Sequence, residues 1–345
     1  MMSQSFNISV VIPVFNAAQF ITKAVDSALK QKEVKEILLV EDGSNDNSLE
    51  ICRQLTQNHT IIRLLQHRDH KNHGASASRN LGLIHAQSEY IAFLDADDFY
   101  LPDRFIKDFE IFNKFKDADG VYNAVGTEFI SQNETDYKKI HPEMLHTIKK
   151  EVEPSVLFPG LLSVIDNFGF ISLDGLTIKK SILSKMNQLF LEDLFPGEDT
   201  EFLIRVSYYC KLFPGTINVP VTLRTVHDAN SIFRNKGKRF EIYFNLWSKL
   251  ISWVQTGNIE SQFIPHIRRV FTCADLTRQP YLSVWLKFIG LIFSDHRYLT
   301  KKIYYNNIHY RLFGFGWPGR ALLGVKNRIQ RVLGISLFLN ATNGE

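Results

Sequence analysis

The sequence predicts an α/β fold, a doubly wound and mostly parallel sheet flanked by helices, with a mainly helical C-terminal extension. Three compact apolar runs carry this prediction: ISVVIPVF at 8–15, EILLV at 36–40 and YIAFL at 90–94. None of them alternates apolar with polar residues, so each strand is expected to be covered on both faces. Helical patterns separate the runs, and alternation of strand and helix is typical of a parallel sheet.

Strand and helix patterns alternate from the amino terminus onward. After the first strand, apolar residues recur at helical spacing in AAQFITKAVDSALKQ, and the turn-forming EDGSNDNS closes the second strand. The sequence then predicts a helical segment, a strand at 61–65, a polar loop HRDHKNHG, a helix over 76–86 and the strand 90–94. Short strands are expected near 121–130 and 176–179, and the pattern from Phe240 is aromatic, basic and helical.

Charge divides the chain into two parts. From Arg234 onward there are 17 lysines and arginines against five acidic residues, a balance of +12, whereas the first 233 residues carry −8. At 345 residues, of which 45% are hydrophobic, the chain is long enough for a large α/β domain and a second region. We therefore expect two domains, 1–233 with the sheet and 234–345 with the basic, aromatic and mainly helical region.

Cysteine use and apolar run lengths favour a cytoplasmic protein. The three cysteines, Cys52, Cys210 and Cys273, are far apart and form no CxxC pair, so neither a disulfide framework nor a cysteine zinc site is predicted. The first apolar run is strand-length and has no basic segment before it, unlike a signal peptide. The longest later run, YLSVWLKFIGLIF, is interrupted by Lys287 and is shorter than a spanning helix, so no transmembrane segment is expected.

The motif DADD, at the end of the strand YIAFL, points to a cation. Asp95 and Asp97, with Asp98 next, offer carboxylate oxygens that can bind a hard cation and leave positions for water and phosphate, as Mg²⁺ prefers. Such a cation would neutralise a diphosphate leaving group. The alternative is a solvated acidic turn that caps a helix beginning near Pro102.

Two further motifs follow strands or open helices. In EDGS, Asp42 ends a buried strand and could face a base or ribose, although Asp, Gly and Ser also suit a plain turn. In NHGASASRNLG, Gly74 allows close backbone approach and Arg79 offers a planar fork for phosphate or a pyrimidine edge, unless it is a surface arginine. The histidines at 67, 70 and 73 lack a cysteine or the HExxH spacing, so a zinc site is not predicted.

The last two motifs lie in the second half of the sheet region. In FPGEDTEFLIRV, Glu198 and Asp199 open a helix, where their charge would at least stabilise the helix dipole. In PVTLRTVHDANS, Arg224 and His227 follow a strand of valine and leucine, where a lone histidine is more often structural than a ligand.

The order of these motifs resembles the family 2 glycosyltransferases, which have the GT-A fold. The series is VVIPVFN, VEDGSND, NHGASASRN, FLDADD, GED and RTVH. The resemblance is specific over 8–103, recognisable at 197–205 and 220–227, and absent after about Arg234.

The resemblance implies a nucleotide site and a metal site. The residues that would bind the nucleotide are Pro13, Val14, Phe15, Asp42, Arg79, Asp95 and Ala96. Most members of the family have tyrosine where this chain has Phe15, so stacking on the base is kept while a hydroxyl contact is lost. Asp42 would bind the uracil edge, and Arg79 the base or the diphosphate. Asp97 would hold Mg²⁺ or Mn²⁺ with His227 near it, and Asp95 would lie near the ribose and the metal's waters.

The resemblance also implies the chemistry. Asp199 matches the acid that acts as catalytic base, with Glu198 beside it. Asp174 would face the acceptor, and Arg224 would support His227. The implied reaction is an inverting transfer of a sugar from a nucleoside-diphosphate sugar, with UDP favoured, to a hydroxyl of a saccharide or lipid-linked saccharide. The implied setting is bacterial surface polysaccharide assembly.

Three alternatives remain open at this point. A nucleotidyltransferase on a similar sheet would normally show a Gly-rich basic loop after the first strand, where this chain has PVFNAAQF. A catalytically inactive binding scaffold would keep the fold but release no UDP. The third alternative is nucleic-acid binding by the basic C-terminal region. An anionic membrane surface suits this region at least as well, because aromatic residues interleave its charges.

We therefore expect a cytoplasmic enzyme that binds no nucleic acid. Its C-terminal region either docks peripherally on the inner face of the plasma membrane or packs as a helical subdomain on the catalytic domain. The clearest amphipathic stretch for this docking is RALLGVKNRIQRVLG at 320–334, where apolar residues can share one face of a helix. They are Leu322, Val325, Ile329 and Leu333.

Overall fold

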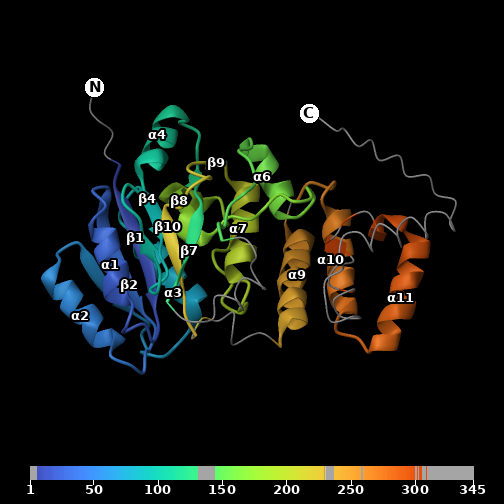
Figure 1. Cartoon of the computed structure of the whole chain (residues 1–345), viewed down its shortest axis with the longest axis horizontal. Helices are drawn as coiled ribbons and strands as arrows, with labels where there is room; N and C mark the ends of the chain where they lie inside the picture. The colour runs from blue at the N-terminus through green and yellow to red at the C-terminus, as the bar shows by residue number, and fades with distance from the viewer. Residues whose placement is uncertain are drawn as a thin grey trace. The chain divides into compact units, whose positions relative to one another are not determined.

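The computed structural model describes residues 6–130, 144–228, 230, 237–257, 259–299, 301, 303, 304 and 308. The chain divides into two compact units, Met1–Ile242 and Tyr243–Glu345. Figure 1 shows the strands of the first unit and the helices of the second.

A seven-stranded sheet organises the first unit, in the order β3-β2-β1-β4-β8-β6-β9. Its strands are β1 Ile8–Val14, β2 Val34–Glu41, β3 Ile62–Gln66, β4 Tyr90–Phe93, β6 Gly120–Tyr122, β8 Leu176–Lys179 and β9 Leu212–Pro214. All paired neighbours run parallel except β8, which is antiparallel to β4 and β6. The predicted α/β fold with a mostly parallel sheet is confirmed.

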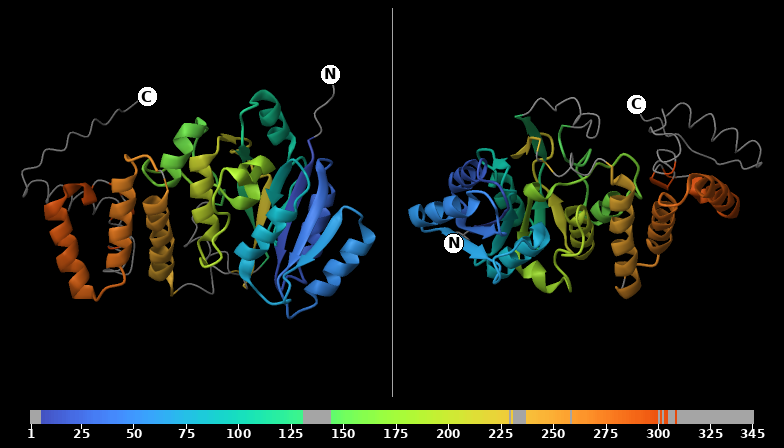
Figure 2. Two further views of the ribbon diagram at one scale, coloured as in Figure 1. Left: turned by 180° about the vertical axis from the view of Figure 1, so that it is seen from behind. Right: turned by 90° about the horizontal axis from the view of Figure 1, so that it is seen from below.

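Helices join the parallel strands and flank the sheet, as the views in Figure 2 show. They are α1 Ile21–Leu29, α2 Ser48–Asn58, α3 Gly74–His85, α4 Ile106–Lys114, α6 Pro154–Leu161 and α7 Glu198–Tyr209. The strand order reverses between β1 and β4, because β2 and β3 continue outward on one side of β1 while β4 returns to the other. Ligands of doubly wound sheets bind outside the carboxyl ends of the strands at such a reversal.

The helix expected near Pro102 begins four residues later, at Ile106. Asp103 has a positive φ of 61°, a left-handed conformation that an α-helix cannot contain. The chain therefore makes a turn after DADD before it enters α4.

A second, three-stranded sheet carries the RTVH motif to DADD. It consists of β5 Phe99–Tyr100, β10 Thr222–Val226 and β7 Val125–Phe129, in the order β5-β10-β7. Because β5 directly follows DADD and pairs with β10, residues more than 120 positions apart in the chain become neighbours. Two 3₁₀ turns, η1 Leu173–Gly175 and η2 Lys180–Ser184, flank β8.

Close packing fixes α3 on the sheet. Gly82 of α3 lies so near β1 that a Cβ at this position would meet Val11 Cγ1 at 2.4 Å. Val11 itself is fully buried. The glycine therefore allows α3, the helix that carries Arg79, to pack closely on β1.

The second unit is helical in its described part. Its helices are α9 Arg239–Thr256, whose first residues precede the unit's boundary, α10 Ile264–Leu276, α11 Tyr281–Ser294 and the 3₁₀ turn η3 His296–Leu299. Among the described residues, none of the helices is both long and apolar enough to cross a membrane. The stretch 320–334, predicted to be amphipathic, lies outside the described residues.

Candidate active site

The predicted site residues gather at the carboxyl ends of β1, β2 and β4, on the edge where the strand order reverses. Phe15 follows β1 and Asp42 follows β2 directly, and Asp95 lies two positions after the end of β4. β10 and the start of α7 add residues from the second half of the unit. Sequence positions from 13 to 227 therefore contribute to one region of the fold.

Asp97 and His227 are in contact. His227 Nε2 lies 3.0 Å from Asp97 Oδ2, and the side-chain amide of Asn230 donates to the same oxygen at 3.2 Å. The imidazole of His227 stacks on the ring of Phe20, with 4.5 Å between centroids. The histidine is thus held in place beside DADD, although 130 residues separate it from Asp97.

The three carboxylates of DADD can converge on one ion. Ligand atoms of Asp95, Asp97 and Asp98 all lie within 4.8 Å of one another. An all-oxygen set with one imidazole nearby suits Mg²⁺ or Mn²⁺ better than zinc. Within the described part of the chain this is the one such group, and the histidines at 67 and 73 do not belong to it.

Asp98 and Asp174 form a buried pair beneath the DADD turn. The side chains of Asp98 and Asp174 are hydrogen-bonded to each other, and the two residues are 3% and 1% exposed. Burial raises the pKa of Asp98 well above its usual value and that of Asp174 to about 7. Asp98 Oδ1 also accepts from the backbone N–H of Thr225, and Asp174 Oδ1 from that of Asp95, at 2.8 and 3.0 Å.

These bonds place Asp174 beneath the DADD turn. From η1, its side chain supports the backbone of DADD. Arg224, on β10, lies close enough for its charge to lower the pKa values of Asp98, Asp174 and Asp199. It therefore belongs to the same electrostatic cluster as these three acids.

Arg79 is the centre of the site. Its side chain is 3% exposed and lies in α3, with Nη2 donating to Asp95 Oδ1 and Nη1 to Asp199 Oδ1, each at 2.7 Å. Glu198 Oε1 lies 3.7 Å from Nη1. Burial alone would lower the pKa of this arginine, but the three carboxylates raise it, so the guanidinium stays charged. The alternative of a surface arginine is excluded by its burial.

Glu198 and Asp199 begin α7, as predicted. Gly197 precedes them at φ 117°, a conformation that glycine adopts without strain. The Glu198 side chain is 8% exposed and that of Asp199 is 33% exposed. Burial, and then the charge of Asp199, raise the pKa of Glu198 to about 7. Burial likewise raises the pKa of Asp199 above its usual value, while Arg79 acts in the opposite direction.

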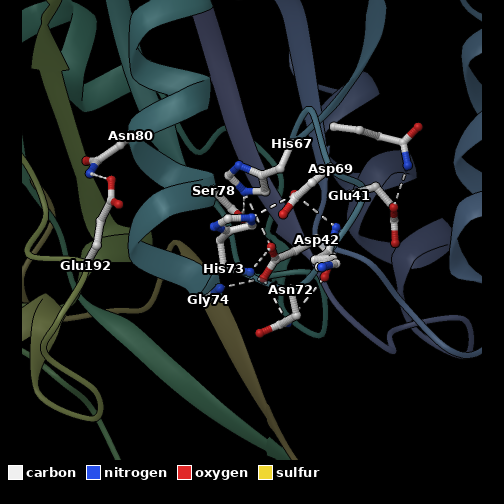
Figure 3. Close-up of polar contacts among 12 residues, drawn as sticks. Glu41, Asp42, His67, Asp69, Asn72, His73, Gly74, Ser78, Asn80 and Glu192 are labelled. Atoms are coloured by element: carbon white, nitrogen blue, oxygen red, sulfur yellow. Dashed lines mark hydrogen bonds and ion pairs between the residues drawn. The ribbon is translucent and has the colours of Figure 1, made fainter.

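The segment before α7 is anchored to two helices. The side-chain amide of Asn80 on α3 donates to the Phe190 carbonyl and to Glu192, both at 3.0 Å, and Figure 3 shows the latter contact. Arg205 on α7 donates to the carbonyls of Gln188 and Leu189. These bonds hold in place the chain that leads into the GED motif.

Asp42 ties the end of β2 to the start of α3 (Figure 3). Its carboxylate accepts from the backbone N–H groups of His73 and Gly74 at 2.7 and 2.8 Å and from the side chain of Asn72 at 2.9 Å. The residue is 2% exposed. Both carboxylate oxygens thus have protein partners, which the expected uracil contact would have to share or displace.

The expected base-contacting residues lie at the end of β1. Val14 is fully buried, Pro13 is half-buried, and the ring of Phe15 is 43% exposed. An exposed aromatic ring beside a sheet edge is available for stacking on a base. Ala96, between two of the DADD carboxylates, is 7% exposed.

Sequence reasoning missed four contacts of this site. Asn230 was not singled out, although HDAN places it three residues after His227. Phe20 was assigned only to an apolar helix face, and nothing in the sequence indicates its stacking on His227. The pairing of Asp98 with Asp174 and the bridging role of Arg79 depend on contacts across the fold, so no local pattern could reveal them.

Known proteins are similar to this chain in sequence, most strongly over its first half. The model of glycosyl transferase family 2 matches residues 9–173. The uncharacterized glycosyltransferase YibD of Escherichia coli is 39% identical over 103 residues, which cover 30% of this chain and 29% of that protein. The uncharacterized glycosyltransferase RT0329 of Rickettsia typhi is 29% identical over 244 residues, 70% of each chain. For several of the curated relatives, YibD included, the matched part spans less than half of their length.

Solved structures share the fold over most of the chain. S. aureus TarS 1–349 in complex with UDP-GlcNAc aligns over 98% of this chain and 95% of its own, with a TM-score of 0.59 and 15% identity. The mannosyltransferase PcManGT of Pyrobaculum calidifontis, in complex with GDP-Man and Mn²⁺, aligns over 94% and 80%, with a TM-score of 0.52 and 14% identity. Residues 9–173 of this chain thus match glycosyl transferase family 2, and the chain shares the GT-A fold of these solved structures.

Proposed function

We propose that this glycosyltransferase is an inverting enzyme that moves a sugar from a UDP-sugar to a hydroxyl of a saccharide or lipid-linked saccharide. The observation that carries the proposal is the position of Arg79, which contacts Asp95 of DADD and Asp199 of α7 at 2.7 Å each. One guanidinium thus links the proposed diphosphate site to a carboxylate with a raised pKa. In a single displacement, the acceptor hydroxyl attacks the anomeric carbon as the diphosphate leaves it. The base that deprotonates this hydroxyl must therefore lie near the diphosphate site.

Asp97 and His227 are proposed to hold Mg²⁺ or Mn²⁺. Their contact at 3.0 Å, and the convergence of the DADD carboxylates within 4.8 Å, fit a hard cation. When bound, the cation would neutralise the nucleoside diphosphate that leaves. The Mn²⁺ in the PcManGT complex supports this assignment by likeness of fold.

The nucleotide is proposed to lie along the end of β1 and the DADD turn. Phe15 would stack on the base, with Pro13, Val14 and Ala96 lining the same edge and Asp95 near the ribose. Asp42 would contact the uracil edge. UDP is our choice of nucleotide because TarS 1–349, which shares the fold, binds UDP-GlcNAc. Since both terminal nitrogens of Arg79 contact carboxylates, we propose that Arg79 positions Asp95 and Asp199 and does not itself bind the base.

Asp199 is proposed as the base. It would take the proton from the acceptor hydroxyl while the oxygen forms a bond to the anomeric carbon and the bond from that carbon to the diphosphate breaks. A carboxylate whose pKa is raised toward neutrality is a better base than an ordinary one. Glu198 is proposed to act through Asp199, because both carboxylates lie next to Arg79 and the charge of Asp199 raises the pKa of Glu198.

The proposed setting is bacterial surface polysaccharide assembly at the inner face of the plasma membrane. Family resemblance and the basic second unit support this setting. The acceptor would be a growing saccharide, free or linked to a lipid.

The test is a donor screen followed by a turnover assay. Thermal unfolding is followed in Mg²⁺ or Mn²⁺ with a panel of UDP-sugars, and the donor that raises the melting temperature most is then assayed for UDP release with candidate acceptors. We expect one UDP-sugar to protect the protein and to release UDP. Formation of UTP and sugar 1-phosphate when pyrophosphate is added to the UDP-sugar would identify a nucleotidyltransferase, and protection without any turnover would identify a binding scaffold.

Asp97→Ala tests the metal site directly. We expect it to abolish metal-dependent UDP binding in calorimetry, because the cation would lose a direct ligand and the diphosphate its bridge to the protein. Asp117→Ala is the matched control, since its side chain is 60% exposed and pairs with Lys211 away from DADD. Wild-type affinity of Asp97→Ala for UDP in Mn²⁺ would reduce DADD to a structural turn.

A further inference from the structure

Helix α11 of the second unit has an apolar face that is buried and another that is exposed. Val284, Phe288 and Ile292 are at most 9% exposed. Leu282, Leu286, Ile289 and Phe293 are 70%, 65%, 41% and 69% exposed. We refer to these last four residues as the α11 stripe.

The spacing of the stripe makes it one continuous surface. Its members are four, three and four residues apart, so their side chains project from the same side of the helix. Single exposed apolar residues are common on protein surfaces, but a contiguous row of large ones marks an interaction site. The α11 stripe therefore needs a partner that is apolar.

Helix length limits what the partner can be. α11 has 14 residues, which is about 21 Å at 1.5 Å per residue, short of the roughly 30 Å of a hydrocarbon core. Lys287 is exposed between two apolar positions of the helix. A helix with an exposed apolar row and a flanking cation is suited to lie in the plane of a membrane interface.

The charge of the second unit favours a lipid surface over a second copy of the chain as the partner of the α11 stripe. The unit Tyr243–Glu345 contains 13 lysines and arginines against four acidic residues. Two copies docked through this unit would bring like charges together, which opposes association. An anionic lipid surface would instead attract the same charges while the stripe enters the apolar layer.

We propose that the α11 stripe is a membrane-docking face that inserts into an anionic lipid surface. Leu282, Leu286, Ile289 and Phe293 supply the apolar contact, and the basic residues of the unit supply attraction to the headgroups. This inference rests on the proposed function in one respect: the anionic lipid was chosen because the proposed setting is the inner face of the plasma membrane. Vesicle binding is measured without donor or acceptor, so its failure can be told apart from a failure of the proposed sugar transfer.

The test is flotation of the full chain with vesicles of phosphatidylcholine, alone or mixed with phosphatidylglycerol. We expect binding to the mixed vesicles at low salt, weakened by added salt because surface charges are screened. The double variant Leu286→Gln/Phe293→Gln should lose at least about tenfold in partitioning, since two large side chains no longer enter the apolar layer. The matched control is Ile84→Gln on α3, where the isoleucine is 66% exposed; it should bind as the wild type does.

Folding and self-association are measured alongside. Because the stripe is exposed, the double variant should keep the circular dichroism spectrum and melting temperature of the wild type. A lower melting temperature with unchanged vesicle binding would show that another part of the chain covers the stripe, and would overturn the proposal. A wild-type dimer that the double variant dissociates, without vesicle binding by either, would assign the stripe to a second copy and overturn it equally.

Discussion

At the scale of single residues, one buried arginine, Arg79, organises a site that contains several acidic residues. Arg79 lies within 3.7 Å of Asp95, Glu198 and Asp199, so not all of these carboxylates can be compensated by its single charge. The surplus negative charge and the burial together raise the pKa values of Glu198 and Asp199. Sequence motifs identified each of these acids, but only the fold shows that they share one arginine.

Asp199→Asn tests the proposed base. Asparagine keeps the size of the side chain and can still begin a helix, but it cannot take a proton. We expect normal folding, near-normal binding of UDP and metal, and transfer slower by at least about 10²-fold, the lower end of what a positioned base contributes. Transfer is measured as sugar incorporation under single-turnover conditions.

Glu198→Gln is the matched control for that variant. If Asp199→Asn transfers sugar at the wild-type rate while Glu198→Gln does not, the base is the neighbouring residue. If both variants remain active, neither acid is the base.

The pH dependence of transfer follows from the same cluster. A base works only when deprotonated, so activity should fall as the pH drops through the raised pKa of the Glu198 and Asp199 pair, about 7 for Glu198. Glu198→Gln removes the negative charge next to Asp199, which should lower the pKa of Asp199 and move this loss of activity to lower pH. The measurement is kcat/KM from about pH 5 to about pH 9, a range that brackets this pKa. An unmoved profile in Glu198→Gln would separate Glu198 from the titration of the base.

At the scale of elements, the sequence predicted those strands and helices that a local pattern of residues determines. β1, β2, β3 and β4 were found because buried parallel strands read as short apolar runs, and α7 because its acids precede an apolar face. The pairing of β5 with β10 was not predictable, since it joins segments that lie more than 100 residues apart and β5 has only two residues. That pairing is what brings His227 to Asp97.

Two helical glycines provide a prediction at this scale. Gly82→Ala would place a Cβ 2.4 Å from Val11 in a fully packed region, and overpacking of this kind costs about 1–3 kcal/mol of unfolding free energy. Gly290→Ala, in α11, meets nothing within 4 Å. It should stabilise its helix by about 0.5–1 kcal/mol, because alanine is the better helix former.

Chemical denaturation of both variants measures this difference. The same substitution should thus change the free energy of unfolding in opposite directions at the two positions. A Gly82→Ala variant as stable as the wild type would mean that α3 can move away from β1 without cost.

At the scale of the whole molecule, the chain is divided by charge and by structure at similar positions. The sequence predicted domains of 1–233 and 234–345 from a change in charge and aromatic content, and the chain divides into two compact units after Ile242. The composition of the second part predicted helices, and its described part is helical. Composition could not assign the exposed face of α11, because which apolar residues of that run are covered depends on the packing of the unit.

Ligand-linked unfolding tests whether the two units are separate domains, as we propose. Every residue of the proposed nucleotide and metal site, from Pro13 to His227, belongs to the unit Met1–Ile242. UDP with Mn²⁺ at about 100 times its dissociation constant stabilises the unit that binds it by about 2.7 kcal/mol. For a unit of this size that should raise one calorimetric transition by about 5–10 °C and leave the other in place. Asp97→Ala should abolish the shift without moving either transition in the absence of ligand by more than a few degrees. A single transition that moves as a whole would show that the two units unfold cooperatively, and the proposed domain division would then have to be given up.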